Sequence, residues 1–201
     1  MSTFNFIDIG TADFRYTEAA PDETGIYVEP LKYYLDKIPD CANCVKENVA
    51  ISSPAGTVSI FYVPEELIYK HKLPHWIKGC NSINNYHPTV VNRLQKNNLD
   101  VDSIIKKLEV PCITLADLFK KHNITHVQKL KIDTEGHDCH IVMQLVDYMQ
   151  SNNIRVDKLI FETNKLSDKD LIDNTINSLL HNGFIQTRRS NIDSEFIYDE
   201  Q

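Results

Sequence analysis

The chain has few glycines and no excess of positive charge, and the lack of positive charge limits the partners that it can bind. Glycine accounts for 6 of the 201 residues, and the formal net charge is -7. Proteins that bind nucleic acid without sequence preference use a basic face to displace counterions from the phosphates. We therefore expect no nucleic-acid partner.

Long apolar runs are missing too. A membrane-spanning helix needs about 18 or more consecutive apolar residues, and no segment approaches that length. The first residues, MSTFNFIDIG, carry neither the basic stretch nor the long apolar stretch of a secretion signal. We therefore expect no membrane association and a cytoplasmic location.

Cysteine occurs five times, and this odd number suggests reduced thiols rather than disulfides. Cys41 and Cys44 form a C-x-x-C, whereas the other three are scattered singly. A structural zinc site usually needs a second pair. We interpret Cys41 and Cys44 as ordinary cysteines near the start of a strand, with a zinc or redox pair as the alternative.

Short apolar runs alternate with helical patterns along most of the chain. The patterns predict strands at 4–10, 25–30, 45–52, 57–63, 110–114, 129–133, 158–162, 184–189 and 195–199. They predict a helix starting within 11–20 and helices at 31–38, 115–123, 138–150 and 168–181. Such alternation is typical of an α/β fold with a parallel sheet and helices on both faces. The last two strands are too close for a crossover, so they must pair antiparallel.

We expect a single domain over residues 1–201. Between about 64 and 108 the pattern breaks into prolines and a Lys/Asn/Asp-rich stretch, which predicts an irregular insertion with one or two short helices.

The strand ends are polar, and ligands of open parallel sheets bind beyond the carboxyl ends of the strands. Gly10 follows the first strand and allows a backbone to approach a ligand closely. Glu29, nineteen positions later, ends the second strand, where an acid commonly binds ribose hydroxyls. The pyrophosphate motif G-x-G-x-x-G is replaced by GTADFR. This favours a nucleoside cofactor without phosphates, S-adenosylmethionine, over NAD or FAD.

Asp133, Glu135 and His137 crowd together behind the strand at 129–133, and three interpretations stay open. Their oxygen and nitrogen atoms suit a metal, but no complete second ligand motif appears, so we expect no metal site. His137 suits a general base because its ordinary pKa lies near 6.5, and burial could raise the pKa of Asp133 or Glu135 toward the same range. Alternatively, Glu135 to His137 simply form a turn and a helix cap.

The chain resembles the FkbM-type methyltransferases, which are class I S-adenosylmethionine-dependent enzymes. The matching segments occur in family order: FIDIGTADF, GIYVEPLKYYL, ENVAISSPAGTVSIFYV, ITLADLF, LKIDTEGHD and LIFETN. The K-I-D-x-E-G-H segment is the most specific of them. The resemblance implies a Rossmann-like, mostly parallel seven-stranded sheet with an antiparallel C-terminal hairpin.

The resemblance also implies roles for individual residues. The cofactor would contact Asp8, Gly10 and Thr11 at its methionine part, Glu29 at its ribose, and Pro30, Leu31, Ala50 and Ile51 around its adenine. Asp133 would lie near the methyl sulfonium and the substrate. Asp13 and Phe14 replace the usual glycine continuation of the first loop, so the shape of that loop can differ.

The insertion is the expected substrate contact, because the chain begins directly at its first strand without the helices that cover the substrate in many relatives. His75 and Trp76 either line a ligand site or fill the insertion's own small core. Asn81 and Ser82 can bond the cofactor's carboxylate or a substrate hydroxyl.

We expect an O-methyltransferase that acts on a hydroxyl or carboxylate of a small molecule or glycan. The alternative is a module that binds the cofactor without turnover; a metal-dependent hydrolase is a third, weaker interpretation. Because an exposed insertion can equally serve as a dimer contact, a homodimer stays open.

Overall fold

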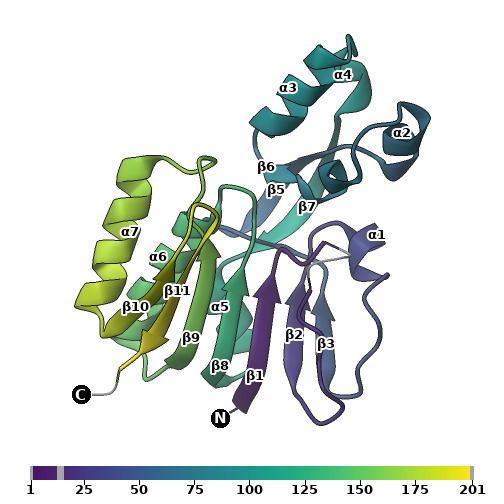
Figure 1. Cartoon of the computed structure of the whole chain (residues 1–201). Helices are drawn as coiled ribbons and strands as arrows, with labels where there is room; N and C mark the ends of the chain where they lie inside the picture. The colour runs from purple at the N-terminus through teal and green to yellow at the C-terminus, as the bar shows by residue number, and fades with distance from the viewer. Residues whose placement is uncertain (1, 13–15, 200–201) are drawn as a thin grey trace.

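The computed structural model describes residues 2–12 and 16–199 (Figure 1). Asp13 and Phe14, the predicted departures from the family pattern, lie outside the described residues. Within the described part, the strands form a sheet of seven in the order β10-β11-β9-β8-β1-β2-β3 and a sheet of four in the order β4-β7-β5-β6.

The elements have the following bounds. The larger sheet contains β1 (Ser2–Ile9), β2 (Gly25–Val28), β3 (Cys44–Glu47), β8 (Ile124–Ile132), β9 (Arg155–Glu162), β10 (Phe184–Arg189) and β11 (Asp193–Tyr198). The smaller sheet contains β4 (Ala50–Ile51), β5 (Gly56–Tyr62), β6 (Ser82–Ile83) and β7 (Lys106–Ile113). The helices are α1 (Lys32–Leu35), α2 (Glu65–Lys70), the 3-10 helix η1 (His75–Gly79), α3 (Pro88–Lys96), α4 (Val101–Ile104), α5 (Leu115–Lys121), α6 (Asp138–Ser151) and α7 (Lys169–His181).

The larger sheet is mixed rather than mostly parallel. β1 pairs in parallel with β2 and β8, β3 and β9 extend the sheet in the same sense, and β11 runs antiparallel between β9 and β10. The predicted α/β architecture with an antiparallel C-terminal hairpin is confirmed. The predicted strands at 57–63 and 110–114 belong instead to the smaller sheet, as β5 and part of β7.

The predicted strand at 45–52 is two strands in two sheets. The side-chain amide of Asn48 donates hydrogen bonds to the carbonyl oxygens of Glu29 and Pro30, both at 2.9 Å. These bonds hold a turn after β3, and β4 then leaves the larger sheet to pair in parallel with β7. The chain thereby brings Ala50 and Ile51 over the end of β2.

The helices are unequally shared between the two faces of the larger sheet. α5, α6 and α7 pack side by side against the main core, which centres on Ile7, Leu130 and Leu159 (Figure 1). On the other face a small cluster around Phe6 and Tyr27 is covered by residues 16–19 and by Leu35 and Ile38.

The helix predicted to start within 11–20 does not form among the described residues of that segment. The backbone N–H of Thr17 donates to a carboxylate oxygen of Asp8 at 2.6 Å, and the hydroxyl of Tyr27 donates to the Thr17 carbonyl at 2.7 Å. These two bonds hold the segment against the sheet as irregular chain and override its helical pattern.

The insertion (residues 64–105) lies beyond the carboxyl ends of the parallel strands (Figure 1). It contains more regular structure than predicted, namely α2, η1, β6, α3 and α4. Its buried side chains, including Ile68, Ile77 and Leu94, form a core separate from the main one. Among the described residues, no helix is long and apolar enough to cross a membrane.

Candidate active site

Adjoining cavities lie between the strand ends and the insertion. A small cavity of about 50 Å³ and a middle cavity of about 260 Å³ share Gly10, Ala12, Gly79, Asp133 and Glu135 as lining residues. A wide cavity of about 590 Å³ meets them at Glu135. Small-molecule sites measure about 300–1,000 Å³, so a nucleoside cofactor would have to occupy the small and middle cavities together.

Gly10 lies where the loops after β1 and β8 meet. Its φ of +82° is in the left-handed region, and a Cβ at this position would lie 1.9 Å from the carbonyl oxygen of Asp133. The Gly10 N–H donates to Val28, and the Asp133 N–H donates to Ile9, both at 2.9 Å. No other residue fits this position without moving the backbone.

Glu29 is buried and both its carboxylate oxygens are engaged. One accepts the N–H of Ala12 and the other the N–H of Leu31, each at 2.9 Å. Glu29 thus holds the loop after β1 against the start of α1. It also lines the small cavity.

Of the other predicted cofactor residues, some line the cavities and two do not. Pro30, Ala50 and Ile51 line the small cavity, and Thr11 lines the middle one. Asp8 and Leu31 are not among the lining residues of either cavity.

Asp8 and Leu31 serve the scaffold around the cavities. Asp8 is fully buried and bonds Thr17, and the Lys131 ammonium lies 3.2 Å from its other oxygen. Leu31 packs with Tyr34 in the core beneath the smaller sheet.

Two buried polar atoms beside the cavities lack a hydrogen-bond partner among the described residues. They are the Thr11 hydroxyl, at the middle cavity, and the Asn81 side-chain carbonyl, at the small cavity. Buried polar groups are normally satisfied by protein, water or ligand atoms, so these two are candidate ligand contacts. A hydroxyl donor and a carbonyl acceptor suit the carboxylate and the ammonium of an amino-acid moiety such as that of S-adenosylmethionine.

Asp138 organises the turn after β8. Its buried carboxylate accepts the backbone N–H groups of Thr134, Gly136 and Glu162 and the Thr134 hydroxyl, at 3.0 to 3.3 Å. Burial, and secondarily the charge of Asp133, raises the pKa of Asp138 to about 7. Sequence reasoning missed this residue, although an acid at a helix start is a recognisable capping signal.

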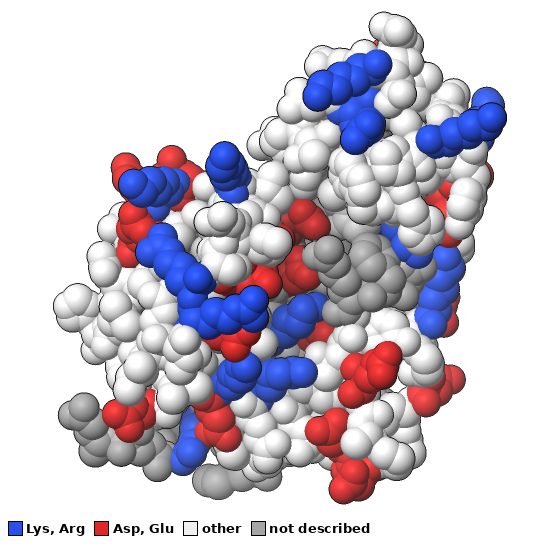
Figure 2. Space-filling view, in the orientation of Figure 1, with Lys and Arg blue, Asp and Glu red and all other residues white. Residues whose placement is uncertain are grey.

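Acids gather in and beside the crevice that the three cavities form: Asp133 and Glu135 line it, whereas Glu162 is not among its lining residues. Asp133, Glu135 and Glu162 each have a carboxylate oxygen within 4.8 Å of the others, and Figure 2 shows acidic side chains in the hollow beneath the insertion. Glu162 is 6% exposed, and one of its oxygens has no partner among the described residues. Burial, then the charges of Glu135, Asp138 and Asp133, raises the pKa of Glu162 to about 9. The sequence showed Glu162 at a strand end but assigned it no role.

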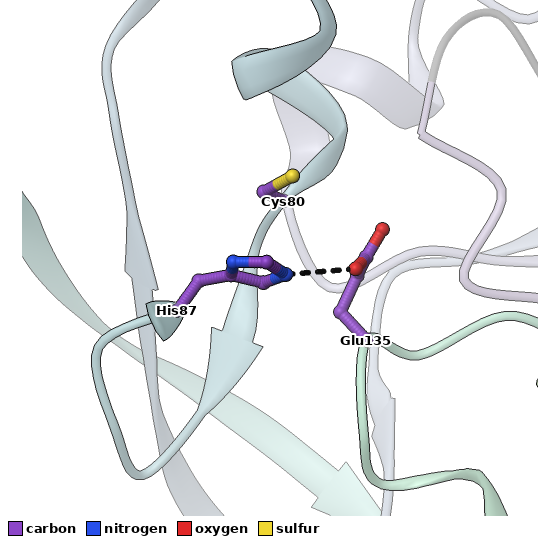
Figure 3. Close-up of side chains that lie close together, drawn as sticks. All are labelled: Cys80, His87 and Glu135. Atoms are coloured by element: carbon purple, nitrogen blue, oxygen red, sulfur yellow. Dashed lines mark hydrogen bonds and ion pairs between the residues drawn. The ribbon is translucent and has the colours of Figure 1, made fainter. Parts of the chain in front are cut away.

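Glu135 points toward the insertion. Its φ is +53°, and its carboxylate lies 3.0 Å from Nε2 of His87, which is 5% exposed (Figure 3). Sequence reasoning missed His87, because nothing in the order of residues predicts its contact with a loop 48 positions away.

His137 is not among the lining residues of the small and middle cavities. Its Nε2 lies 3.0 Å from the Ser52 hydroxyl, and it lines the wide cavity. Burial, and secondarily the nearby His140, lowers the pKa of His137 to about 4. A neutral imidazole of such low basicity is poorly matched to general-base catalysis near pH 7.

Three of the four predicted substrate residues line a cavity, and the fourth does not. Trp76 is 39% exposed and lines the middle cavity, so it does not fill the insertion core. Asn81 lines the small cavity and Ser82 the wide one, where its hydroxyl donates to the Asn85 carbonyl. His75 lines none of the three and lies against Tyr69.

Comparison with known proteins adds one match. A family model described as the methyltransferase FkbM domain matches residues 8–185. No curated protein and no solved structure matches the chain. The matched span contains the residues that line the three cavities, from Ile9 to Leu166.

Proposed function

The chain belongs to the FkbM methyltransferase family, and on that premise we propose that it transfers a methyl group from S-adenosylmethionine to an oxygen atom of a small molecule or glycan. The observation that carries the proposal is the lining of the small and middle cavities. Gly10, Glu29, Ala50 and Ile51 meet there, although they follow three different strands.

The lining is divided as a nucleoside amino acid requires. Glu29 offers carboxylate oxygens for ribose hydroxyls, while Pro30, Ala50 and Ile51 offer apolar contacts for a base. Thr11 and Asn81 offer polar atoms that have no partner among residues 2–12 and 16–199 for the amino-acid end. When bound, S-adenosylmethionine supplies an electrophilic methyl group on a sulfonium.

We assign the general base to Asp133. It lines both the small and the middle cavity and lies next to Gly10, whereas His137 points toward Ser52. A carboxylate there would accept the proton of the acceptor hydroxyl as its oxygen bonds to the methyl group. The rest of the site would align the reactants and exclude water.

The acceptor enters, in this proposal, from the side of the insertion. Trp76 at the middle cavity and Ser82 at the wide cavity offer a flat apolar surface and a polar edge, which suits a small molecule or a glycan.

The reduced cysteines suit a reducing compartment, so we place the reaction in the cytoplasm.

Calorimetric titration with S-adenosylhomocysteine tests the cofactor. We expect binding in the micromolar range, and Glu29→Ala should weaken it more than tenfold, because the change removes the ribose acceptor and loosens Ala12 and Leu31. Glu47→Ala is the matched control: Glu47 is equally buried at the end of the neighbouring strand, where it bonds Lys121 and His122 outside the cavities. An unchanged dissociation constant in Glu29→Ala would contradict the assignment.

Asp133→Asn tests the reaction. We expect a loss of about 10²–10⁴-fold in the rate of methyl transfer, with the affinity for S-adenosylhomocysteine within about threefold of wild type. Cofactor binding by the wild type without transfer to any of a broad panel of hydroxyl and carboxylate acceptors would favour the alternative, a binding module without turnover.

A further inference from the structure

Three side chains of different chemistry converge where the insertion meets the loop after β8. Cys80, His87 and Glu135 each place one ligand-type atom within 4.8 Å of the other two. Figure 3 shows the three side chains around one shared space, with Nε2 of His87 directed at the Glu135 carboxylate. They come from three segments: the end of η1, the residue before α3, and the turn after β8.

The backbone of the insertion is shaped to bring His87 back beside Cys80. Asn84 has a left-handed φ of +61°, and its N–H donates to the Ser59 carbonyl at 2.8 Å. This turn reverses the chain after β6, and Pro88 then sets the first turn of α3. His87 is therefore held by a tight turn on one side and a helix start on the other.

Glu135 is held in a conformation that ordinary residues avoid. Its φ of +53° is followed by +100° at Gly136, whose missing side chain leaves room for Leu166. A non-glycine residue in this region costs on the order of 1–3 kcal/mol, and such residues concentrate at functional sites. The strained turn directs the Glu135 carboxylate at His87 and Cys80.

We propose that Cys80, His87 and Glu135 form a binding site for a divalent metal ion of the zinc class. Thiolate, imidazole and carboxylate together suit Zn²⁺, whereas Mg²⁺ and Ca²⁺ prefer oxygen alone. Zinc bonds these atoms at about 2.0–2.3 Å, which places tetrahedral ligand atoms about 3.5 Å apart. The observed separations, from 3.0 Å up to 4.8 Å, need only small side-chain rotations to reach that geometry.

Charge around the cluster favours a cation. A thiolate and the Glu135 carboxylate balance a divalent ion, and Asp133 and Glu162 place two more carboxyl groups within 4.8 Å of Glu135. Acids crowded in a partly buried site repel one another, and a bound cation relieves that repulsion.

The competing explanation is an ordinary His–Glu pair that ties the insertion to the sheet. His87 is the less usual member of such a pair, because its buried Nδ1 has no partner among the described residues. In the metal-free pair Nε2–H donates to the Glu135 carboxylate, and nothing among the described residues holds Nδ1; an imidazole that carries its proton on Nδ1 instead can bind a metal through Nε2. The chain offers a pair of the ordinary kind for comparison: His122 lies 2.7 Å from Glu47, and within the described part of the chain this pair belongs to no cluster with a cysteine.

Three protein ligands leave a fourth position open, as in catalytic rather than structural zinc sites. Cys80 and Glu135 line the middle cavity together with Gly10 and Thr11, so that position faces the proposed cofactor site. The chemical consequence rests on the proposed function: an acceptor hydroxyl bound to the metal there would lose its proton more readily. Independently of that function, the metal would fasten the insertion to the loop after β8.

Cobalt titration of the purified chain tests the site without cofactor or acceptor. The titration uses a Cys41→Ser/Cys44→Ser background, because these two thiols lie near each other and could bind metal themselves. We expect one Co²⁺ per chain, a thiolate-to-cobalt charge-transfer band in the near ultraviolet, and displacement of the cobalt by Zn²⁺.

Variants identify the ligands. Cys80→Ser should abolish the charge-transfer band, and His87→Gln and Glu135→Gln should each weaken binding more than tenfold. His122→Gln should leave cobalt binding unchanged, and circular dichroism verifies that each variant is folded.

Absence of stoichiometric binding in the folded background protein would overturn the proposal. Binding without a thiolate band, or binding insensitive to His87→Gln, would do so as well and would point to the carboxylates of Asp133, Glu135 and Glu162 instead. Calorimetry with S-adenosylhomocysteine on the same samples separates this outcome from failure of the proposed function.

Discussion

At the scale of single residues, Glu162 shows how burial changes the chemistry of a carboxyl group at a strand end. Its pKa is raised to about 9 by burial and by the neighbouring acids, so it is protonated at neutral pH. In the unfolded chain it ionises near pH 4.5. The unfolded state thus binds fewer protons between these values, and the free energy of unfolding falls as pH rises from about 4.5 to about 9.

Glu162→Gln should remove this dependence, because the amide resembles the protonated acid in shape and never ionises. We expect the variant to match wild type near pH 5 and to exceed it by about 3 kcal/mol near pH 8 in the metal-free protein. Urea denaturation at both pH values measures the difference. Parallel pH curves for the two proteins would contradict the raised pKa.

The close approach of the Asp133 carbonyl oxygen to Gly10 leads to a prediction about side chains at this position. Gly10→Ala must place a Cβ 1.9 Å from the Asp133 carbonyl oxygen, so it should cost more than about 3 kcal/mol and abolish cofactor binding. Gly183→Ala is the matched control: its φ of +86° is nearly the same, but the nearest atom to its Cβ is in the side-chain ring of Tyr198 at 3.1 Å, and the nearest backbone atom lies at 3.7 Å. That change should cost about 1–2 kcal/mol. Equal losses of stability in the two variants would mean that the left-handed φ, rather than the contact with Asp133, determines the cost of the substitution.

The sequence was informative about residues whose position follows from topology. Gly10, Glu29 and Asp133 each follow a strand, and parallel strands bring their carboxyl ends to one edge. Asp138 and His87 depend instead on how the turn after β8 folds and on where the insertion comes to lie. Neither is encoded in local spacing, so the sequence alone could not bring these residues together.

At the scale of elements, α1 and α2 are joined by one acid. Glu65 of α2 accepts hydrogen bonds from Lys37, at 2.7 Å, and from the hydroxyls of Tyr33 and Tyr69. These bonds, that of Lys37 first, lower the pKa of Glu65 to about 2. The stabilisation is present above about pH 4.5, where the unfolded carboxyl is also ionised, and is lost as pH falls toward 2.

Glu65→Gln should therefore be less stable than wild type by about 1 kcal/mol at pH 6, since the pair is partly exposed. The difference should narrow steadily as pH falls below 4.5. Thermal unfolding of both proteins across this range measures it. Glu66→Gln, on the neighbouring residue of the same helix turn, is the control and should show no such convergence.

Elements were predictable where their own residues decide their form. α6, α7 and β10 lie close to their predicted bounds, because each has a clear apolar period and a recognisable start or end. β3 and β4 were read as one strand, because the break depends on Asn48 bonding the carbonyl groups of a distant loop. β7 extends four residues before its predicted start because the polar stretch from Lys106 to Glu109 pairs with β5, and pairing, not composition, makes it a strand.

At the scale of the whole molecule, the main core and the core of the insertion are separate clusters of buried side chains. The main core lies under the larger sheet, while the insertion has its own core around Ile77 and Leu94. The proposed metal site and the cavities lie on the boundary between them. The insertion can therefore lose local stability without unfolding of the sheet, and the crevice would be the first part affected.

The variants Ile77→Ala and Leu130→Ala test whether the two cores unfold independently, because both side chains are fully buried, one in each core. Truncation of a large buried aliphatic side chain costs about 2–5 kcal/mol. Leu130→Ala should lower hydrogen-exchange protection throughout the larger sheet. Ile77→Ala should lower it in α2, η1 and α3, leave β8 and β9 near wild type, and weaken cobalt binding through Cys80 and His87. Equal loss of protection in both regions from either variant would show instead that insertion and sheet unfold as one cooperative unit. The strained turn at Glu135 would then be held by the whole fold rather than by the insertion that meets it.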